Sequence, residues 1–427
     1  MKDLAETEDE FLENKNEDIN KIISLLQFNK EELLQDQYRN GVLFNRIKKL
    51  AISKGGFLDN NSRRKLWEIL FYKNKARKSN KKNIIDIIKI NEDIKVHIFE
   101  LNLLSQKKEL TDSKIKEIKD YQVILNDLSR TCENIITNKI IKKEDGITNI
   151  SPKIFMFSCQ KFQYQYLQGL LNIIFYFQQI FNHYEDCINA LNIYFEFFYK
   201  DLIDRKLCKD INDKNIGLIT EVVTNIYKYL YPNSEENKII NYIPILCNKW
   251  IISSFISEVK DINKGFRILD YLIVSEPYVK YVLAAILINK FHDAINTKHE
   301  INEKLDSLGS SYENIFDELK KEDINFFDFD EIINEVQNLI ETKGEKIKTY
   351  LIENYGKNFI YTFNDKNQGL ITYYRNLIEI KDIKKPKKEF KLNLGNPKYY
   401  KYFFVIASIS MILYKFYDLL DNARLFW

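Results

Sequence analysis

Glycine and proline are scarce along this chain, and their scarcity is what most limits the folds that it can adopt. The 427 residues include 12 glycines and 6 prolines. Because these two residue types break helices and form tight turns, their rarity favours long helices joined by few turns. Hydrophobic residues make up 45% of the chain and charged residues 29%, which is typical of a globular protein. The sequence therefore predicts an all-α fold.

The pattern of polar and apolar residues divides the chain into four parts. Residues 1–41 form a charged N-terminal segment, in which we expect residues 1–18 to be mobile and residues 19–35 to form a helix. An ordered domain is expected over residues 42–345, a polar and basic linker over 346–396, and an apolar segment over 397–427. Within the domain, the basic stretch 73–83 reads as a solvated loop.

Helical spacing of apolar residues predicts the elements of the domain. Asn61 and Ser62 are expected to cap a helix that carries Trp67. Further helical patterns cover residues 85–105, 112–142, 151–182, 186–231, 239–258, 263–272, 276–294, 312–320 and 328–342. We find no internal repeat in the sequence.

Charge and composition argue against several classes of function. The net charge of +3 and the lack of a long basic face disfavour nucleic acid as the main partner. The five cysteines contain no CxxC pair and read as reduced, buried thiols, while the four histidines lack the spacing of metal ligands. The acidic first residues do not predict a secretory signal. A free-standing hydrolase is disfavoured because no Gly-rich phosphate loop or nucleophile–base arrangement is evident.

An arginine follows a carboxylate at helical spacing in residues 124–131, Ile-Leu-Asn-Asp-Leu-Ser-Arg-Thr. Residues three and four positions apart share a helix face, so one stripe would carry Ile124, Asp127, Arg130 and Thr131. Asp127 could hold the base of the Arg130 guanidinium while its tip points outward. Taken alone, the pattern also fits an ordinary surface ion pair, which is the commoner case.

A glutamine stands next to a glycine in residues 166–169, Tyr-Leu-Gln-Gly, just before an apolar run. Gly169 allows close approach of the backbone, and Tyr166 can pack beside it as an aromatic support. The Gln168 amide carries a donor and an acceptor, which suits the positioning of a water and a phosphate oxygen. Taken alone, the segment also fits a loop-to-helix junction with a solvated glutamine.

The order and spacing of these segments resemble the TBC domain, the family of activators of Rab GTPases. The family's arginine-finger motif I-x-x-D-x-x-R-[ST] matches residues 124–131 at every fixed position, and its glutamine-finger motif Y-x-Q-G matches residues 166–169. Its opening segment matches Gly56, Phe57, Arg63 and Trp67. Residues 250–255 and 266–270 are similar to its later W…F…R-[LI]-x-D segment, which is expected to be structural. The resemblance covers about residues 42–343, and the 73–83 stretch would be an insertion.

The resemblance implies a two-lobed helical fold and a catalytic role in trans. Arg130 would bring a cation to the GTP of the partner, and Gln168 would orient the attacking water. The supporting residues would be Asp127, Thr131, Tyr166, Gly169, Asn172, Arg63 and Trp67. GTP and magnesium would belong to the partner, so the chain is expected to need no cofactor or metal of its own. Asn172 departs from the family, which usually has an acidic residue there, and this departure is expected to weaken the support of Gln168.

The C-terminal segment carries the apolar run 402–414, bracketed by Lys401 and Lys415. This run is shorter than the ~20 residues that span a bilayer, but residues 399–417 suffice if the two lysines reach the interface. The alternative is a final helix docked on the domain. Residues 51–56 and the order of later blocks are similar to the ER-anchored TBC subfamily, whose members end in a tail anchor and act in ER-to-Golgi transport. This likeness implies a protein on the cytosolic face of the endoplasmic reticulum or Golgi.

Two other classes of function remain open from the sequence. A non-catalytic TBC-like adaptor would bind a Rab or a trafficking partner without accelerating hydrolysis. A helical membrane scaffold would make both motifs coincidental, and it predicts that Arg130 and Gln168 lie far apart or are buried.

Overall fold

Helices dominate the part of the chain that the computed structural model describes. The described residues are 8–28, 37–72, 127, 164–181, 184–204, 212–232, 238–304, 314–317, 324–360 and 362–363. Within these ranges no strand forms, and one isolated antiparallel bridge joins Tyr164 to Asp204. The all-α prediction is confirmed at this level.

The helices follow the apolar spacing of the sequence, with bounds that differ from the predicted ones at several ends. In chain order they are α1 (Glu8–Phe28), α3 (Gln37–Ile52), α4 (Asn60–Tyr72), α9 (Leu170–Ile180), α10 (Tyr184–Phe198), α11 (Lys200–Ile203), α13 (Asn212–Leu230), η2 (Lys238–Tyr242), α14 (Ile243–Ile252), η3 (Ile256–Glu258), α15 (Ile262–Val274), α16 (Val279–Lys304) and α18 (Phe329–Tyr355).

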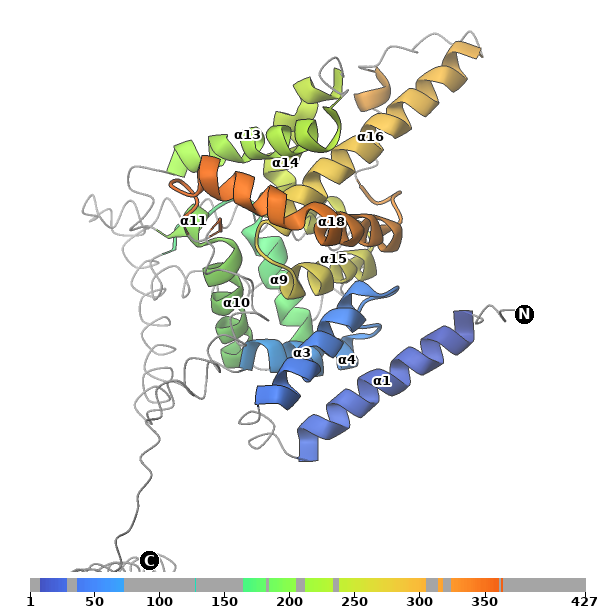
Figure 1. The fold of residues 1–427 in the computed structure, drawn as a ribbon, viewed down its shortest axis with the longest axis vertical. Helices are drawn as coiled ribbons and strands as arrows, with labels where there is room; N and C mark the ends of the chain where they lie inside the picture. The colour runs from blue at the N-terminus through green and yellow to red at the C-terminus, as the bar shows by residue number, and fades with distance from the viewer. Residues whose placement is uncertain are drawn as a thin grey trace, which may run out of the picture. The chain divides into compact units, whose positions relative to one another are not determined.

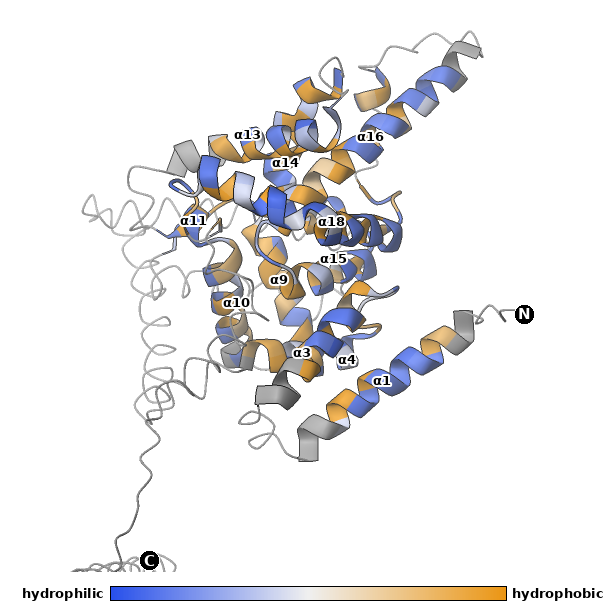
Figure 2. Ribbon diagram, viewed as in Figure 1, coloured by the Kyte–Doolittle hydropathy of each residue, from blue (hydrophilic) through white to orange (hydrophobic). Residues whose placement is uncertain are grey.

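Packing between these helices forms one hydrophobic core (Figure 1). α13 packs against α14 and α16, α18 packs against α15 and α16, and α4, α9 and α10 pack against one another. Fully buried aromatic rings join these helices. The Trp67 ring of α4, for example, lies 5.0 Å from the Phe177 ring of α9 and 6.3 Å from the Phe266 ring of α15, measured between centroids. α9 is mostly apolar along its length, whereas α16 passes from apolar residues in its first half to polar ones later (Figure 2).

The N-terminal helix begins earlier than predicted. We expected residues 1–18 to be mobile, but α1 (Glu8–Phe28) covers much of that acidic stretch. Residues 29–35 of the predicted helix lie outside the described residues. Lys15, Ile19, Ile22 and Ile23 are buried, and the last three belong to the hydrophobic core. Packing against the core therefore holds this helix in place, although the charged composition of its first half suggested mobile sequence.

The cap of α4 lies before the predicted residues. Asn61 and Ser62 fall inside the first turn, and their backbone N–H groups donate to Asp59 Oδ1 at 2.8 and 3.0 Å. The Ser62 hydroxyl donates to Asp59 Oδ2 at 2.7 Å. Burial alone would raise the pKa of Asp59, but these hydrogen bonds outweigh it and lower that pKa. Asp59 is thus the residue that satisfies the free N–H groups of this helix start.

The predicted linker begins inside a helix. We expected polar linker sequence from residue 346, but α18 continues to Tyr355 and the chain beyond it remains packed to Phe363. Every fourth residue of this stretch is buried: Ile347, Leu351, Tyr355, Phe359 and Phe363. The polar residues between them hide this single apolar stripe in the average composition.

The chain divides into two units, Met1–Ile378 and Glu379–Trp427, and the second lies wholly outside the described residues. The predicted anchor at 397–427 falls in that second unit, and the basic stretch 73–83 also lies outside the described ranges. Among the helices that the structure describes, none has the length and hydropathy needed to cross a bilayer.

Candidate functional site

Gln168 and Gly169 form the tip of a tight turn that leads into α9. The Leu170 N–H donates to the Leu167 carbonyl at 3.2 Å, and Gly169 has φ of 103° and ψ of −18°. These angles match the third position of a type II turn, which requires a positive φ and therefore favours glycine. The turn leaves the Gln168 side chain exposed to solvent. The turn that presents Gln168 thus accounts for the glycine that follows it.

Asp127, from the arginine-containing segment, is bound by the glutamine-containing segment. Its Oδ2 accepts a hydrogen bond from the Tyr166 hydroxyl and another from the Gly169 N–H, the latter at 3.2 Å. Asp127 is 6% exposed and helical in backbone conformation. One carboxylate oxygen therefore joins two segments that are distant in sequence, since 42 positions separate Asp127 from Gly169.

Asn172 binds the other side of the same turn. Its side-chain N–H donates to the Gly169 carbonyl at 3.3 Å, and its backbone N–H donates to the same oxygen at 3.2 Å. The carboxylate expected here from the TBC resemblance could not donate such a bond. The amide therefore adds a contact to Gly169, and the described geometry gives no sign of the weakened support that we expected from this departure.

The remaining predicted catalytic group lies outside the described residues. Arg130 and Thr131 follow Asp127 by three and four positions, and only Asp127 of that segment is described. The suggested contact of Asp127 with the Arg130 guanidinium is therefore a prediction, whereas the contacts of Asp127 with Tyr166 and Gly169 are observed.

Arg63 and Trp67 share a single buried carboxylate. Arg63 Nε lies 2.9 Å from Asp270 Oδ1, and Trp67 Nε1 donates to the same oxygen at 3.0 Å. The Phe57 N–H donates to Asp270 Oδ2 at 3.1 Å. The Arg63 and Asp270 side chains are 3% and 0% exposed. These residues of the opening and later segments thus hold α4, α15 and the turn before α4 together, and they touch neither Gln168 nor Asp127 in any described contact.

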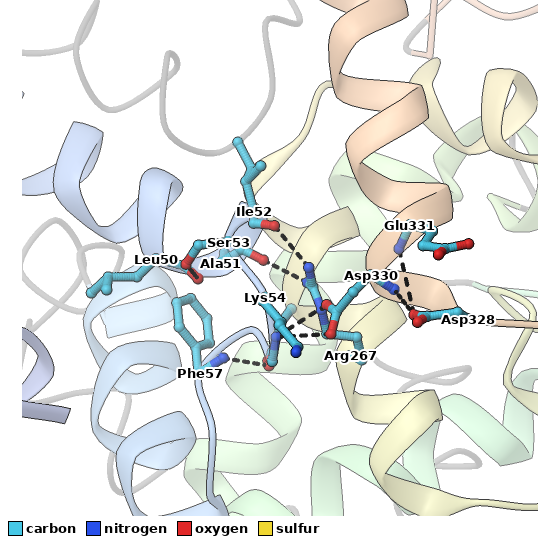
Figure 3. Close-up of polar contacts among 12 residues, drawn as sticks. Leu50, Ala51, Ile52, Ser53, Lys54, Phe57, Arg267, Asp328, Asp330 and Glu331 are labelled. Atoms are coloured by element: carbon cyan, nitrogen blue, oxygen red, sulfur yellow. Dashed lines mark hydrogen bonds and ion pairs between the residues drawn. The ribbon is translucent and has the colours of Figure 1, made fainter. Parts of the chain in front are cut away.

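Arg267 performs a similar task beside them (Figure 3). Its guanidinium donates to the carbonyls of Ala51 and Ile52 at the end of α3, at 2.6 and 2.8 Å. It also pairs with Asp330 at the start of α18, and that carboxylate accepts the Gly55 N–H. Arg267 therefore connects three segments that lie far apart in sequence.

Lys15 of α1 completes this network. Its Nζ donates to the carbonyls of Ser53 and Lys54, the former at 3.3 Å, and the residue is 5% exposed. Burial and, after it, the nearby Arg267 cation lower the pKa of Lys15 to about 7, against the opposing effect of the Asp330 and Asp270 carboxylates. The sequence did not indicate this lysine, since one lysine in a charged helix carries no distinguishing spacing.

Two further properties of the described residues bear on cofactors and redox chemistry. No cluster of histidine, cysteine, aspartate or glutamate there has the make-up of a metal site. Cys187 and Cys247 are buried and unpaired, as predicted, and burial raises the pKa of the Cys247 thiol to about 11. At neutral pH the Cys247 thiol is accordingly protonated and a poor nucleophile.

No family model matches this sequence, and no curated protein matches it either.

Proposed function

We propose that this chain accelerates GTP hydrolysis by a Rab-family small GTPase, to which it supplies Arg130 and Gln168 in trans. One observation carries the proposal: the Asp127 carboxylate is bound by Tyr166 and Gly169. Arg130 follows Asp127 by three positions in the sequence and Gln168 directly precedes Gly169, so this contact supports the proposal that the two side chains act at one place. The helical fold supports the further proposal of a two-lobed TBC-type domain.

The chemistry requires a cation and a polar amide at that place. GTP hydrolysis spreads negative charge over the departing γ-phosphoryl group, and an arginine supplied in trans raises kcat by about 10³- to 10⁵-fold. The planar fork of Arg130 can bind two phosphate oxygens at once. The exposed amide of Gln168 can accept from the attacking water and donate to an oxygen of the phosphate.

Asp127, Tyr166 and Asn172 act on geometry rather than on the reacting atoms in this proposal. Asp127 binds the Gly169 N–H, Asn172 binds the Gly169 carbonyl, and Tyr166 donates to the same oxygen of Asp127. A turn held in this way presents the glutamine with little reorganisation when the partner binds. GTP and magnesium remain bound to the partner.

Single-turnover GTP hydrolysis across a panel of Rab proteins tests the proposal. The wild-type chain should accelerate hydrolysis by at least one Rab, Arg130→Ala should abolish nearly all of that effect, and Gln168→Ala should reduce it strongly. Matched controls are Arg46→Ala, which removes an arginine paired with Asp18 on the surface, and Gln337→Ala, whose amide donates to Glu341. An Arg130→Ala chain with full activity would remove the central assignment.

The alternative is a TBC-like adaptor that binds a Rab or a trafficking partner without stimulating it. The departure at Asn172 suggested this alternative, and the contact of Asn172 with Gly169 argues against it. Binding without acceleration by the wild-type chain, across the whole panel, would favour the adaptor.

We further propose that the protein acts at the endoplasmic reticulum or Golgi in ER-to-Golgi transport, anchored through residues 397–427. The support is the sequence of this segment, whose apolar run lies between two lysines. Removal of these residues should move the protein from the membrane fraction to the supernatant, and retention on membranes would show a different attachment.

A further inference from the structure

α14 ends beside the Gln168–Gly169 turn in a corner of strained backbone. Ser254 and Phe255 have φ values of 52° and 68°, in the left-handed region that residues with side chains rarely adopt. Such conformations persist only where the surrounding structure enforces them, and they cluster at functional sites. We use "the α14 corner" for Ser253, Ser254 and Phe255.

A chain of buried hydroxyl groups enforces this conformation. The Tyr199 hydroxyl donates to the Ile251 carbonyl at 3.0 Å, and its oxygen lies 2.6 Å from the Ser254 hydroxyl. Ser254 Oγ also lies 2.8 Å from the Tyr194 hydroxyl. Because each hydroxyl has one proton to donate, Ser254 donates to Tyr199 and accepts from Tyr194. The chain thus has one direction, from Tyr194 to the carbonyl of Ile251.

This hydroxyl chain persists across the physiological pH range. Burial raises the pKa of both Tyr194 and Tyr199 above the ordinary value of a tyrosine. Both phenols consequently keep their protons. Phe255 reinforces the corner, since its N–H donates to the Trp250 carbonyl at 2.7 Å and its side chain is fully buried.

The outer side of the α14 corner meets the turn at Gly169. A Cβ atom added to Gly169 would lie 3.5 Å from Ser253 Cβ and 3.7 Å from Ile252 Cγ2, which is ordinary van der Waals contact. Ser253 is itself fixed, because its hydroxyl donates to the Lys249 carbonyl at 2.8 Å and lies 2.8 Å from the Ser257 hydroxyl. A rigid surface therefore stands directly against the backbone that carries Gln168.

Three groups now surround Gly169. Asp127 binds its N–H, Asn172 binds its carbonyl, and Ser253 lies beside its α-carbon. The first two fix the plane of the peptide groups, but only the third opposes movement of the turn towards α14. We infer that the α14 corner, locked by Tyr194 and Tyr199, is the positioning element that sets where Gln168 is presented to the partner's nucleotide. This inference rests on the proposed function.

Ser254→Ala tests the inference because it interrupts the hydroxyl chain without touching Gly169. In single-turnover hydrolysis with a responsive Rab, we expect kcat to fall about tenfold or more, since small displacements of a catalytic group have effects of this size. The KM for the Rab should stay within about twofold. In a Gln168→Ala background, Ser254→Ala should cause no further loss, because the group that it positions is already absent.

A matched control and a second variant separate positioning from loss of folding. Ser275→Ala removes a buried serine hydroxyl that donates to the Tyr271 carbonyl at 2.7 Å, far along the sequence from the turn, and it should leave kcat unchanged. If Ser254→Ala does not fold, Tyr194→Phe replaces it, since that change keeps the ring and removes only the first donor. An equal loss from Ser254→Ala with and without Gln168, or no loss, would overturn the inference.

Amide hydrogen exchange at Gly169 provides a readout that needs no GTPase. Its N–H is bonded to Asp127, so loosening of the turn should speed its exchange in Ser254→Ala and not in Ser275→Ala. Unchanged exchange at Gly169 in a folded Ser254→Ala chain would refute the positioning role. If no Rab responds to the wild-type chain, the proposed function fails, and the exchange result alone then decides whether the α14 corner holds the turn.

Discussion

Individual buried charges in this molecule are held by specific partners, and Asp127 and Lys280 illustrate two different consequences. Asp127 accepts from Tyr166 and Gly169 and so organises the turn that carries Gln168. Lys280 lies 1% exposed in α16, where its Nζ donates to the Phe198 carbonyl at 2.6 Å and stands 4.3 Å from the centre of the Tyr199 ring. Burial lowers the pKa of Lys280 to about 7, against the opposing effect of Asp201.

Lys280 should make stability depend on pH in a defined direction. In the unfolded chain a lysine holds its proton up to about pH 10.5, whereas folded Lys280 loses it near pH 7. Between these values the unfolded state binds more protons, so the free energy of unfolding should rise with pH. Urea denaturation from pH 7 to about 9.5, below the range where tyrosines ionise, should show this rise, and Lys280→Met should flatten it.

Lys290→Met serves as the matched control on the same helix. Lys290 is partly exposed and paired with Glu335 at 2.9 Å, and that pairing raises its pKa rather than lowering it. The control should keep the rise of stability with pH. An unchanged slope in Lys280→Met would show that Lys280 is not neutral in the folded chain at high pH. Lys15, whose pKa is also lowered, should account for part of the slope that remains.

The sequence predicted those residues of the site whose binding partners belong to one of the two finger motifs. Tyr166, Gly169 and Asp127 were identified as supports because their spacing matched two short patterns, and the structure brings these three together. Ser253 was missed, since its contact with Gly169 joins residues more than 80 positions apart and depends on how α14 ends. Nothing local in the sequence marks Ser254 as a residue with a positive φ.

At the scale of elements, the helices were predicted better than their ends. Helical spacing located α15 to within two residues at each end, because its apolar residues form a continuous stripe. α14 was predicted to continue to residue 258, but it stops at Ile252 and the α14 corner intervenes. The first half of α1, up to residue 18, was assigned to mobile sequence and the end of α18 to linker, because charged residues there outnumber the buried ones.

The chain after α18 should contribute to stability although it was predicted as linker. Phe359 is fully buried, with its ring 6.2 Å from Tyr281, whereas the adjacent Ile360 is 44% exposed. Phe359→Ala should therefore lower the free energy of unfolding by about 3–5 kcal/mol. Ile360→Ala, its neighbour and control, should change that free energy by no more than about 0.5 kcal/mol. Equal effects in chemical denaturation would show that this stretch does not pack as described.

At the scale of the molecule, buried ion pairs join segments that are distant in sequence. Asp270 binds Arg63, Trp67 and the Phe57 N–H, and Arg267 binds the end of α3 and the start of α18. The sequence indicated that Arg63, Trp67 and Asp270 belong to two structural segments. It could not indicate that both segments meet at one carboxylate, because 203 residues separate Trp67 from Asp270.

Neutralising Asp270 tests the importance of this network. Asp270→Asn leaves the buried Arg63 cation without its counter-charge, so the free energy of unfolding should fall by about 3–5 kcal/mol. Asp18→Asn, which breaks an exposed pair with Arg46, should change it by no more than about 1 kcal/mol. Similar values for the two variants in urea denaturation would mean that the buried pair does not hold the helices together.

Binding to a transition-state analogue tests the central claim most directly. A protein that contributes Arg130 and Gln168 to the reaction must bind the transition state more tightly than the ground state. The measurement is the affinity of the chain for a responsive Rab loaded with GDP, with and without aluminium fluoride, which imitates the transferring phosphoryl group. We predict a complex at least about 100-fold tighter with aluminium fluoride, and loss of that gain in Arg130→Ala. Equal affinity in both nucleotide states would contradict the account.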